Sequence, residues 1–78
     1  MLSPETAVRI LECGGGLRLP VKGLPPETMV RYARAAKQGG ARLELVVDGA
    51  MLMPDTLMKV SLAGGGMVVF DYTGSGQA

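Results

Sequence analysis

A pattern of proline, an acidic residue and threonine occurs three times in the 78 residues, and it constrains the fold more than any other feature of the sequence. The copies begin at Pro4, Pro26 and Pro54, so successive copies are 22 and 28 residues apart. The first glycine of a glycine run lies ten or more residues after each proline, and the chain then enters a short apolar segment. This spacing is typical of α/β repeat proteins in which each unit contributes one helix and one strand.

Each copy predicts the start of a helix. Proline fits the first helical position because it has no backbone N–H to lose and its φ is already near the helical value. Ser3 precedes the first proline, and serine is a favourable N-cap residue. An acidic residue follows each proline, and a basic residue lies four positions further on, which indicates a solvated helix face. The three acid–base pairs are Glu5 with Arg9, Glu27 with Arg31, and Asp55 with Lys59.

The opposite face of each predicted helix is apolar and is expected to pack on a sheet. The residues on these faces are Ala7, Val8, Leu11, Met29, Val30, Ala33, Leu57, Met58 and Leu62. Glycines then end each helix, and the segments that follow are rich in residues that favour strands. These segments are Leu17 to Val21, Leu43 to Val47 and Met67 to Tyr72.

Helices and strands that alternate with short links predict parallel strands and right-handed crossovers. We therefore expect an α/β fold of three helix–strand units, with a small three-stranded, mainly parallel sheet and all helices on one face. The second strand is expected in the middle, because Pro20 removes a ladder donor from the first strand and suits an edge. Asp48-Gly49 leaves an alternative open, since Asp-Gly between apolar runs also predicts a hairpin from Leu43 to Met53.

The predicted strands also suggest an interface. If side chains alternate from the leucines, the helix side of the sheet carries Leu17, Leu19, Leu43, Leu45, Met67 and Val69. The other side carries Arg18, Pro20, Glu44, Val46, Val68, Phe70 and Tyr72. The last strand is then apolar on both faces, which is typical of a strand buried on both sides. We therefore predict a subunit or partner interface at Val46, Val68, Phe70 and Tyr72.

The units resemble leucine-rich repeats, most closely the ribonuclease-inhibitor type, which has a helix in every unit. The resemblance rests on the strands Leu17-Arg18-Leu19 and Leu43-Glu44-Leu45, on Leu24 as the turn leucine, and on the helices Pro26 to Gln38 and Pro54 to Ala63. It implies a protein-binding or self-assembling scaffold rather than an enzyme.

Composition sets further bounds on the protein. With 47% hydrophobic residues and a net charge of +1, residues 1–73 are expected to form one globular domain, and residues 74–78 a flexible tail. Such a short domain has a thin core, so we expect a homo-oligomer, most simply a dimer. The single cysteine, Cys13, is expected in the core and fits a reducing compartment, which indicates a cytoplasmic protein. No membrane segment is expected.

The sequence contains no signature of catalysis, and we expect no cofactor, metal site or enzyme activity. Histidine is absent, and the acidic residues lack the close spacing of a metal site. The triple glycines follow helices, whereas a phosphate-binding loop leads into a helix N-terminus. The sequence thus predicts a noncatalytic interaction or self-assembly module, such as a small regulatory or scaffold subunit.

Nucleic-acid binding is the alternative function. Arg31, Arg34 and Lys37 are spaced three residues apart on the predicted central helix, and Arg42 follows it. The charge is also uneven, because residues 1–43 contain seven Lys and Arg against three Glu, while residues 44–78 contain one Lys against four acidic residues. This asymmetry also predicts head-to-tail or antiparallel pairing of subunits that added salt would weaken.

Overall fold

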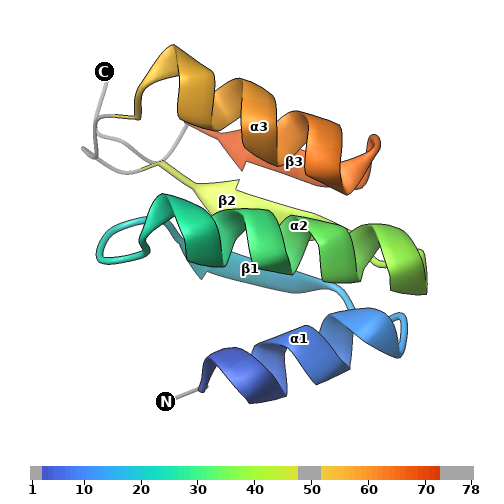
Figure 1. Ribbon diagram of the computed structural model, residues 1–78. Coiled ribbons are helices and arrows are strands. Elements are labelled where there is room, and N and C mark those ends of the chain that lie inside the picture. Colours follow the sequence, from blue (N-terminus) through green and yellow to red (C-terminus); the bar gives the residue numbers. More distant parts are fainter. Residues whose placement is uncertain (1–2, 48–51, 73–78) are drawn as a thin grey trace.

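The computed structural model describes residues 3–47 and 52–72, which form a two-layer α/β fold (Figure 1). Along the chain the elements are α1 (Pro4–Glu12), β1 (Leu17–Pro20), α2 (Pro26–Gly39), β2 (Leu43–Val46), α3 (Pro54–Gly64) and β3 (Val68–Asp71). The predicted α/β class with three helix–strand units is therefore confirmed. The predicted tail at residues 74–78 lies outside the described residues.

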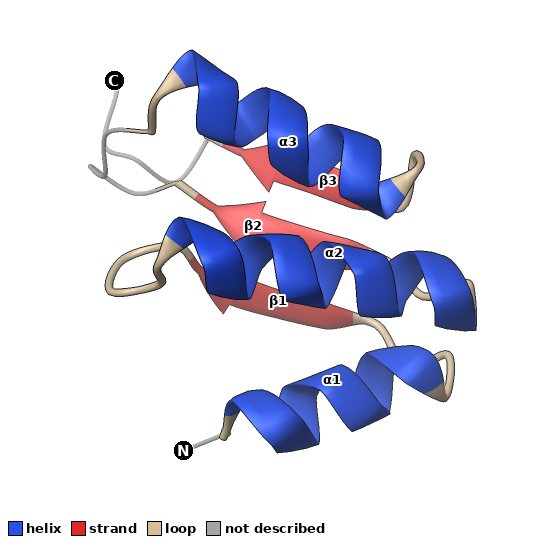
Figure 2. Ribbon diagram, in the orientation of Figure 1, coloured by secondary structure: helices blue, strands red, loops and turns tan. Residues whose placement is uncertain are grey.

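The sheet has the strand order β1-β2-β3, and both pairs of neighbouring strands are parallel. All three helices lie on one face of the sheet and the crossovers are right-handed, as predicted (Figure 2). β2 is the central strand, and β1 with Pro20 is an edge strand. The turn of the alternative hairpin, residues 48–51, lies outside the described residues. Since both neighbours of β2 are parallel to it, no described strand forms that hairpin.

The helix ends follow the local signals in the sequence. Each helix starts at its proline, and the Ser3 hydroxyl accepts a hydrogen bond from the backbone N–H of Thr6 at 3.3 Å. Gly40 and Gly65 end α2 and α3 in the left-handed region, with φ of 67° and 56°. All members of the three acid–base pairs are exposed, and among the described residues none of these pairs forms an ion pair.

The core lies between the sheet and the helical layer. Leu43 and Leu45 of the central strand are fully buried, because β2 has a strand on each side and helices above it. The other buried apolar residues are Ala7, Leu11, Val21, Met29, Tyr32, Ala33, Ala35, Ala36, Ala41, Val47 and Val60. Many are alanines, so the helices pack close to each other and to the sheet.

α1 and α2 are in close contact where Gly39 meets the end of α1. A Cβ atom at Gly39 would overlap the backbone carbonyl oxygen of Leu11. A backbone carbonyl cannot turn away as a flexible side chain can, so only glycine permits this packing. The second glycine of the Gly39-Gly40 break therefore ends the helix, and the first allows the contact.

Three residues predicted to be in the core are exposed. On α3, Met58 is 64% exposed and Leu62 is 80% exposed, while Val60 is buried instead. Cys13, the C-cap residue that follows α1, is exposed. The cause is the position of both helices, because α1 and α3 lie at the two ends of the helical layer and have a neighbouring helix on one side only (Figure 1).

Candidate interaction surfaces

The side chains of β3 point the opposite way from the prediction. The parallel register pairs Leu43 with Val68 and Leu45 with Phe70, and residues paired in this way point to the same face of a sheet. Val68 and Phe70 therefore lie on the helix side. A Cβ at Gly64 would overlap the Val68 side chain, which places Val68 against α3. The prediction was wrong because residues 67–70 are all apolar, so nothing in them sets the phase of the alternation.

The predicted interface residues are consequently divided between surfaces. Phe70 and Tyr72 lie at the end of the sheet beside α3, whereas Val68 packs beneath α3. Val46 is paired with Asp71 and so lies on the opposite face, away from the helices. The involvement of these residues in an interface stays a prediction, but they do not form one continuous patch.

An apolar groove of about 390 Å³, which we call the end groove, lies between α3 and β3. It is lined by Leu57, Met58, Ser61, Leu62, Phe70 and Tyr72. None of these side chains is charged, Met58 and Leu62 are largely exposed, and Tyr72 is about half exposed. Exposed apolar side chains gathered at one place indicate an interaction surface, whereas scattered ones do not.

Beside the end groove lies the outer backbone edge of β3. The N–H groups of Leu43 and Val47 donate to the carbonyl oxygens of Met67 and Asp71 at 2.9 and 2.8 Å. Alternate residues of a strand direct their backbone groups to opposite edges, so those of Val68 and Phe70 point away from β2. No described strand pairs with β3 on that side. Such an edge is a template for pairing with another chain.

The other edge of the sheet is protected. The N–H groups of Leu17 and Val21 donate to β2, so the backbone groups of Arg18 and Pro20 point outward. Proline has no N–H, which leaves this edge one donor short. α1 also lies next to β1 at this end of the molecule (Figure 1). The two edges of the sheet are therefore not equivalent.

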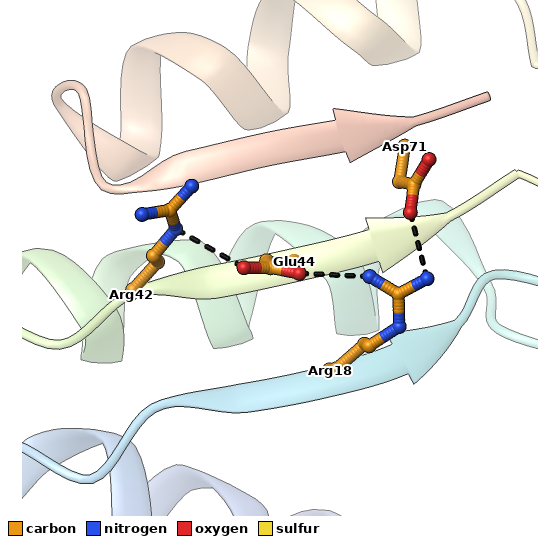
Figure 3. Close-up of polar contacts among 4 residues, drawn as sticks. All are labelled: Arg18, Arg42, Glu44 and Asp71. Carbon is orange, nitrogen blue, oxygen red and sulfur yellow. Dashed lines mark hydrogen bonds and ion pairs between the residues drawn. The ribbon is translucent and has the colours of Figure 1, made fainter. Parts of the chain in front are cut away.

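The face of the sheet away from the helices carries a row of ion pairs across all three strands (Figure 3). Arg18 contacts Glu44 at 2.8 Å and Asp71 at 2.7 Å, and Arg42 contacts Glu44 at 3.1 Å. The hydrogen bonds that Arg18 donates to Asp71, and then to Glu44, hold the pKa of Arg18 above its ordinary value. Arg18 and Glu44 were predicted on one face, but Asp71 was not predicted beside them because the predicted alternation of β3 was out of phase.

The predicted basic face is also divided. Arg42 lies on the open face of the sheet, where it pairs with Glu44. Arg34 and Lys37 line a shallow hollow between α2 and α3, and Lys59 of α3 lines an adjoining one with Arg34. Arg31 is exposed on α2. Lys59 was not predicted as a neighbour of Arg34, because only the packing of α2 against α3 brings the two residues together.

Comparison with known proteins finds no matching family model, no matching curated protein and no matching solved structure. The resemblance to leucine-rich repeats therefore stays a prediction. Within residues 3–47 and 52–72, no helix is long and apolar enough to cross a membrane. The same residues contain no group of three or more Cys, Asp or Glu side chains placed to hold a metal ion.

Proposed function

We propose that the protein is a noncatalytic protein–protein interaction module that associates with a second copy of itself through the end groove. The observation that carries this proposal is the exposure of Met58, Leu62 and Tyr72 around an uncharged groove beside an open strand edge. Complete burial of a Leu or Met side chain contributes about 1.5–3 kcal/mol, and a symmetric contact buries each of them twice.

The charge distribution favours a second copy as the occupant of the end groove. A symmetric contact brings a surface against itself, so like charges in it would repel. The end groove has no charged residue, and the one charge on β3, Asp71, is paired with Arg18 on the open face. A copy of the chain can therefore meet the groove without repulsion.

Such a self-associating module would serve as a small scaffold or regulatory subunit. We assign it to the cytoplasm, where the exposed thiol of Cys13 would remain reduced. In this function the sheet and the ion pairs act as a rigid support, and the α3–β3 end of the molecule makes the contact.

Sedimentation analysis of three chains tests the proposal. At about 100 μM we expect a dimer for the natural sequence, because a micromolar dissociation constant corresponds to only about 8 kcal/mol. Leu62→Glu should be monomeric with unchanged helix content, since Leu62 is 80% exposed and contributes little to folding. Gln38→Glu adds the same charge to an exposed position on α2 and should remain dimeric. A monomeric natural chain, or a Leu62→Glu variant that stays dimeric, would contradict the proposal.

A second candidate function is nucleic-acid binding at the hollows between α2 and α3. The observation in its favour is that Arg34, Lys37 and Lys59, contributed by two helices, surround them. Three phosphate contacts to a single strand predict that the logarithm of the binding constant falls with that of the salt concentration at a slope of about −2. Fluorescence titration of a single-stranded nucleic acid at several salt concentrations measures this slope. Arg34→Ser removes one contact and should make the slope shallower. Binding that does not respond to salt, or is absent, removes this candidate.

A further inference from the structure

We infer that two copies of the chain pair β3 with β3 in antiparallel direction around a two-fold axis perpendicular to the sheet. The two sheets then become one continuous six-stranded sheet, and the two α3 helices lie side by side on the same face. The inference rests on the proposed function and specifies the geometry of the contact.

The outer edge of β3 has the backbone donors and acceptors that such pairing requires. Val68 and Phe70 direct both an N–H and a C=O group to the open edge. In an antiparallel pair, two opposed residues exchange both hydrogen bonds, so a strand edge of this kind supplies everything that its own copy needs. An edge strand of a folded domain that lacks proline and a bulge is open to pairing of this type.

The helical layer points to the same arrangement. Met58 and Leu62 lie four and eight residues after Pro54, as Val30 and Arg34 lie after Pro26. In α2 these two positions face α3, because both residues line a hollow to which α3 contributes Lys59, Leu62 and Ala63. Met58 is thus placed to meet a further helix, which the described chain does not contain. The exposed side chain of Leu62 borders both this hollow and the end groove, so it would lie at the edge of such a contact. The α3 helix of a second copy supplies that helix.

Two observations disfavour the head-to-tail stacking that the uneven charge predicted. A parallel ladder from β3 to β1 would lose a hydrogen bond, because Pro20 has no N–H on the outward edge. In addition, Arg18 and Arg42 already pair with Glu44 and Asp71 within the chain. These four charges, two from each half, are paired inside one molecule and are less available to join two.

Amide hydrogen exchange on the natural chain tests the strand pairing. The N–H groups of Val68 and Phe70 exchange readily in a monomer, and a population that is 90% dimer should slow them about tenfold. The N–H of Val69 faces β2, so it is protected in monomer and dimer alike and serves as an internal control. The Leu62→Glu monomer provides the unprotected reference for Val68 and Phe70.

Paired spin labels test the two-fold axis. In a Cys13→Ser background, labels at Lys59→Cys in the middle of α3 should lie within about 25 Å of each other, since packed helices lie about 8–10 Å apart. Labels at Glu5→Cys on α1 should be much further apart, because α1 lies at the opposite end of the helical layer (Figure 1).

The outcomes separate this inference from the proposed function. Slowed exchange at Val68 and Phe70 together with close Lys59 labels supports both. A dimer that Leu62→Glu dissociates, but in which these amides exchange rapidly or the Lys59 labels are distant, keeps the function and overturns the geometry. Mass that grows beyond a dimer with concentration also overturns the geometry, because head-to-tail contacts do not close. A natural chain that never associates removes both.

Discussion

The guanidinium group of Arg18 on β1 lies 2.7 Å from the carboxylate of Asp71 on β3, although β2 separates the two strands. The contact links the first strand of the sheet to the last and crosses β2 beside Glu44, which Arg18 also binds (Figure 3). It directs the one charge of β3 to the open face of the sheet. The helix side of the same strand is therefore wholly apolar. The uncharged lining of the end groove depends on this.

A double-mutant cycle should detect the coupling of Arg18 and Asp71. We expect Arg18→Ala and Asp71→Asn to destabilise the fold by less in combination than the sum of the single changes, because each removes the same contact. The coupling should be small, since the Arg18 side chain is 56% exposed. It should shrink in about 1 M salt, where charges are screened within about 3 Å. Urea denaturation measures it, and additive effects at low salt would contradict the prediction.

The pH dependence of this contact follows from the raised pKa of Arg18. A base whose pKa is higher in the folded state contributes its full stability below its unfolded pKa and loses it as the pH rises through the folded pKa. The stability difference between the natural chain and Arg18→Ala should therefore stay constant from neutral to mildly alkaline pH. Urea midpoints measured over this range check the prediction, and a steady decrease would speak against it.

Gly39→Ala should destabilise the fold by about 1–3 kcal/mol or more. Alanine favours a helix over glycine by about 1 kcal/mol, but its Cβ would overlap the carbonyl oxygen of Leu11, and the overlap should prevail. Thermal unfolding measures the change. Gln38→Ala, at the exposed neighbouring position, is the matched control and should alter the stability by no more than about 0.5 kcal/mol. A neutral Gly39→Ala would mean that α1 and α2 lie further apart.

Leu45→Ala and Leu62→Ala should differ sharply in their effect on the free energy of unfolding, although both replace a leucine. Leu45 is fully buried, so its truncation should cost about 2–5 kcal/mol, comparable with the whole stability of a small domain. Leu62 is 80% exposed, and its truncation should change the unfolding free energy of the monomer by about 0.5 kcal/mol or less. Urea unfolding followed by circular dichroism measures both free energies. Equal losses of stability would contradict the exposure of Leu62 on α3.

Ser3→Ala should lower the stability by about 1 kcal/mol, because the N–H of Thr6 loses the oxygen that caps α1. Ser3→Asp retains an acceptor at the same position and should restore most of the loss. Thermal midpoints of the three chains provide the measurement. If aspartate fails to restore the stability, the contribution of Ser3 is something other than capping.

Local signals predicted the elements, but the end groove could not be predicted from them. Each helix starts at its proline, and Ser3 also caps α1, because both signals act on the adjacent backbone. The exposure of Met58 and Leu62 could not be predicted from local signals, because both residues fit an apolar helix face. Whether that face is covered depends on how many helices lie beside α3, and this is a property of the whole layer.

The sequence by itself determined the α/β class, the order of the helices and strands, and the edge position of Pro20, because alternating elements with short links permit few parallel arrangements. Only the tertiary structure decided which face of the sheet each β3 side chain occupies. Residues 67–70 are all apolar and carry no alternation of their own. Their direction depends on the packing of Val68 against Gly64 and on the pairing of Asp71 with Arg18, and both contacts join residues that only the folded chain brings together.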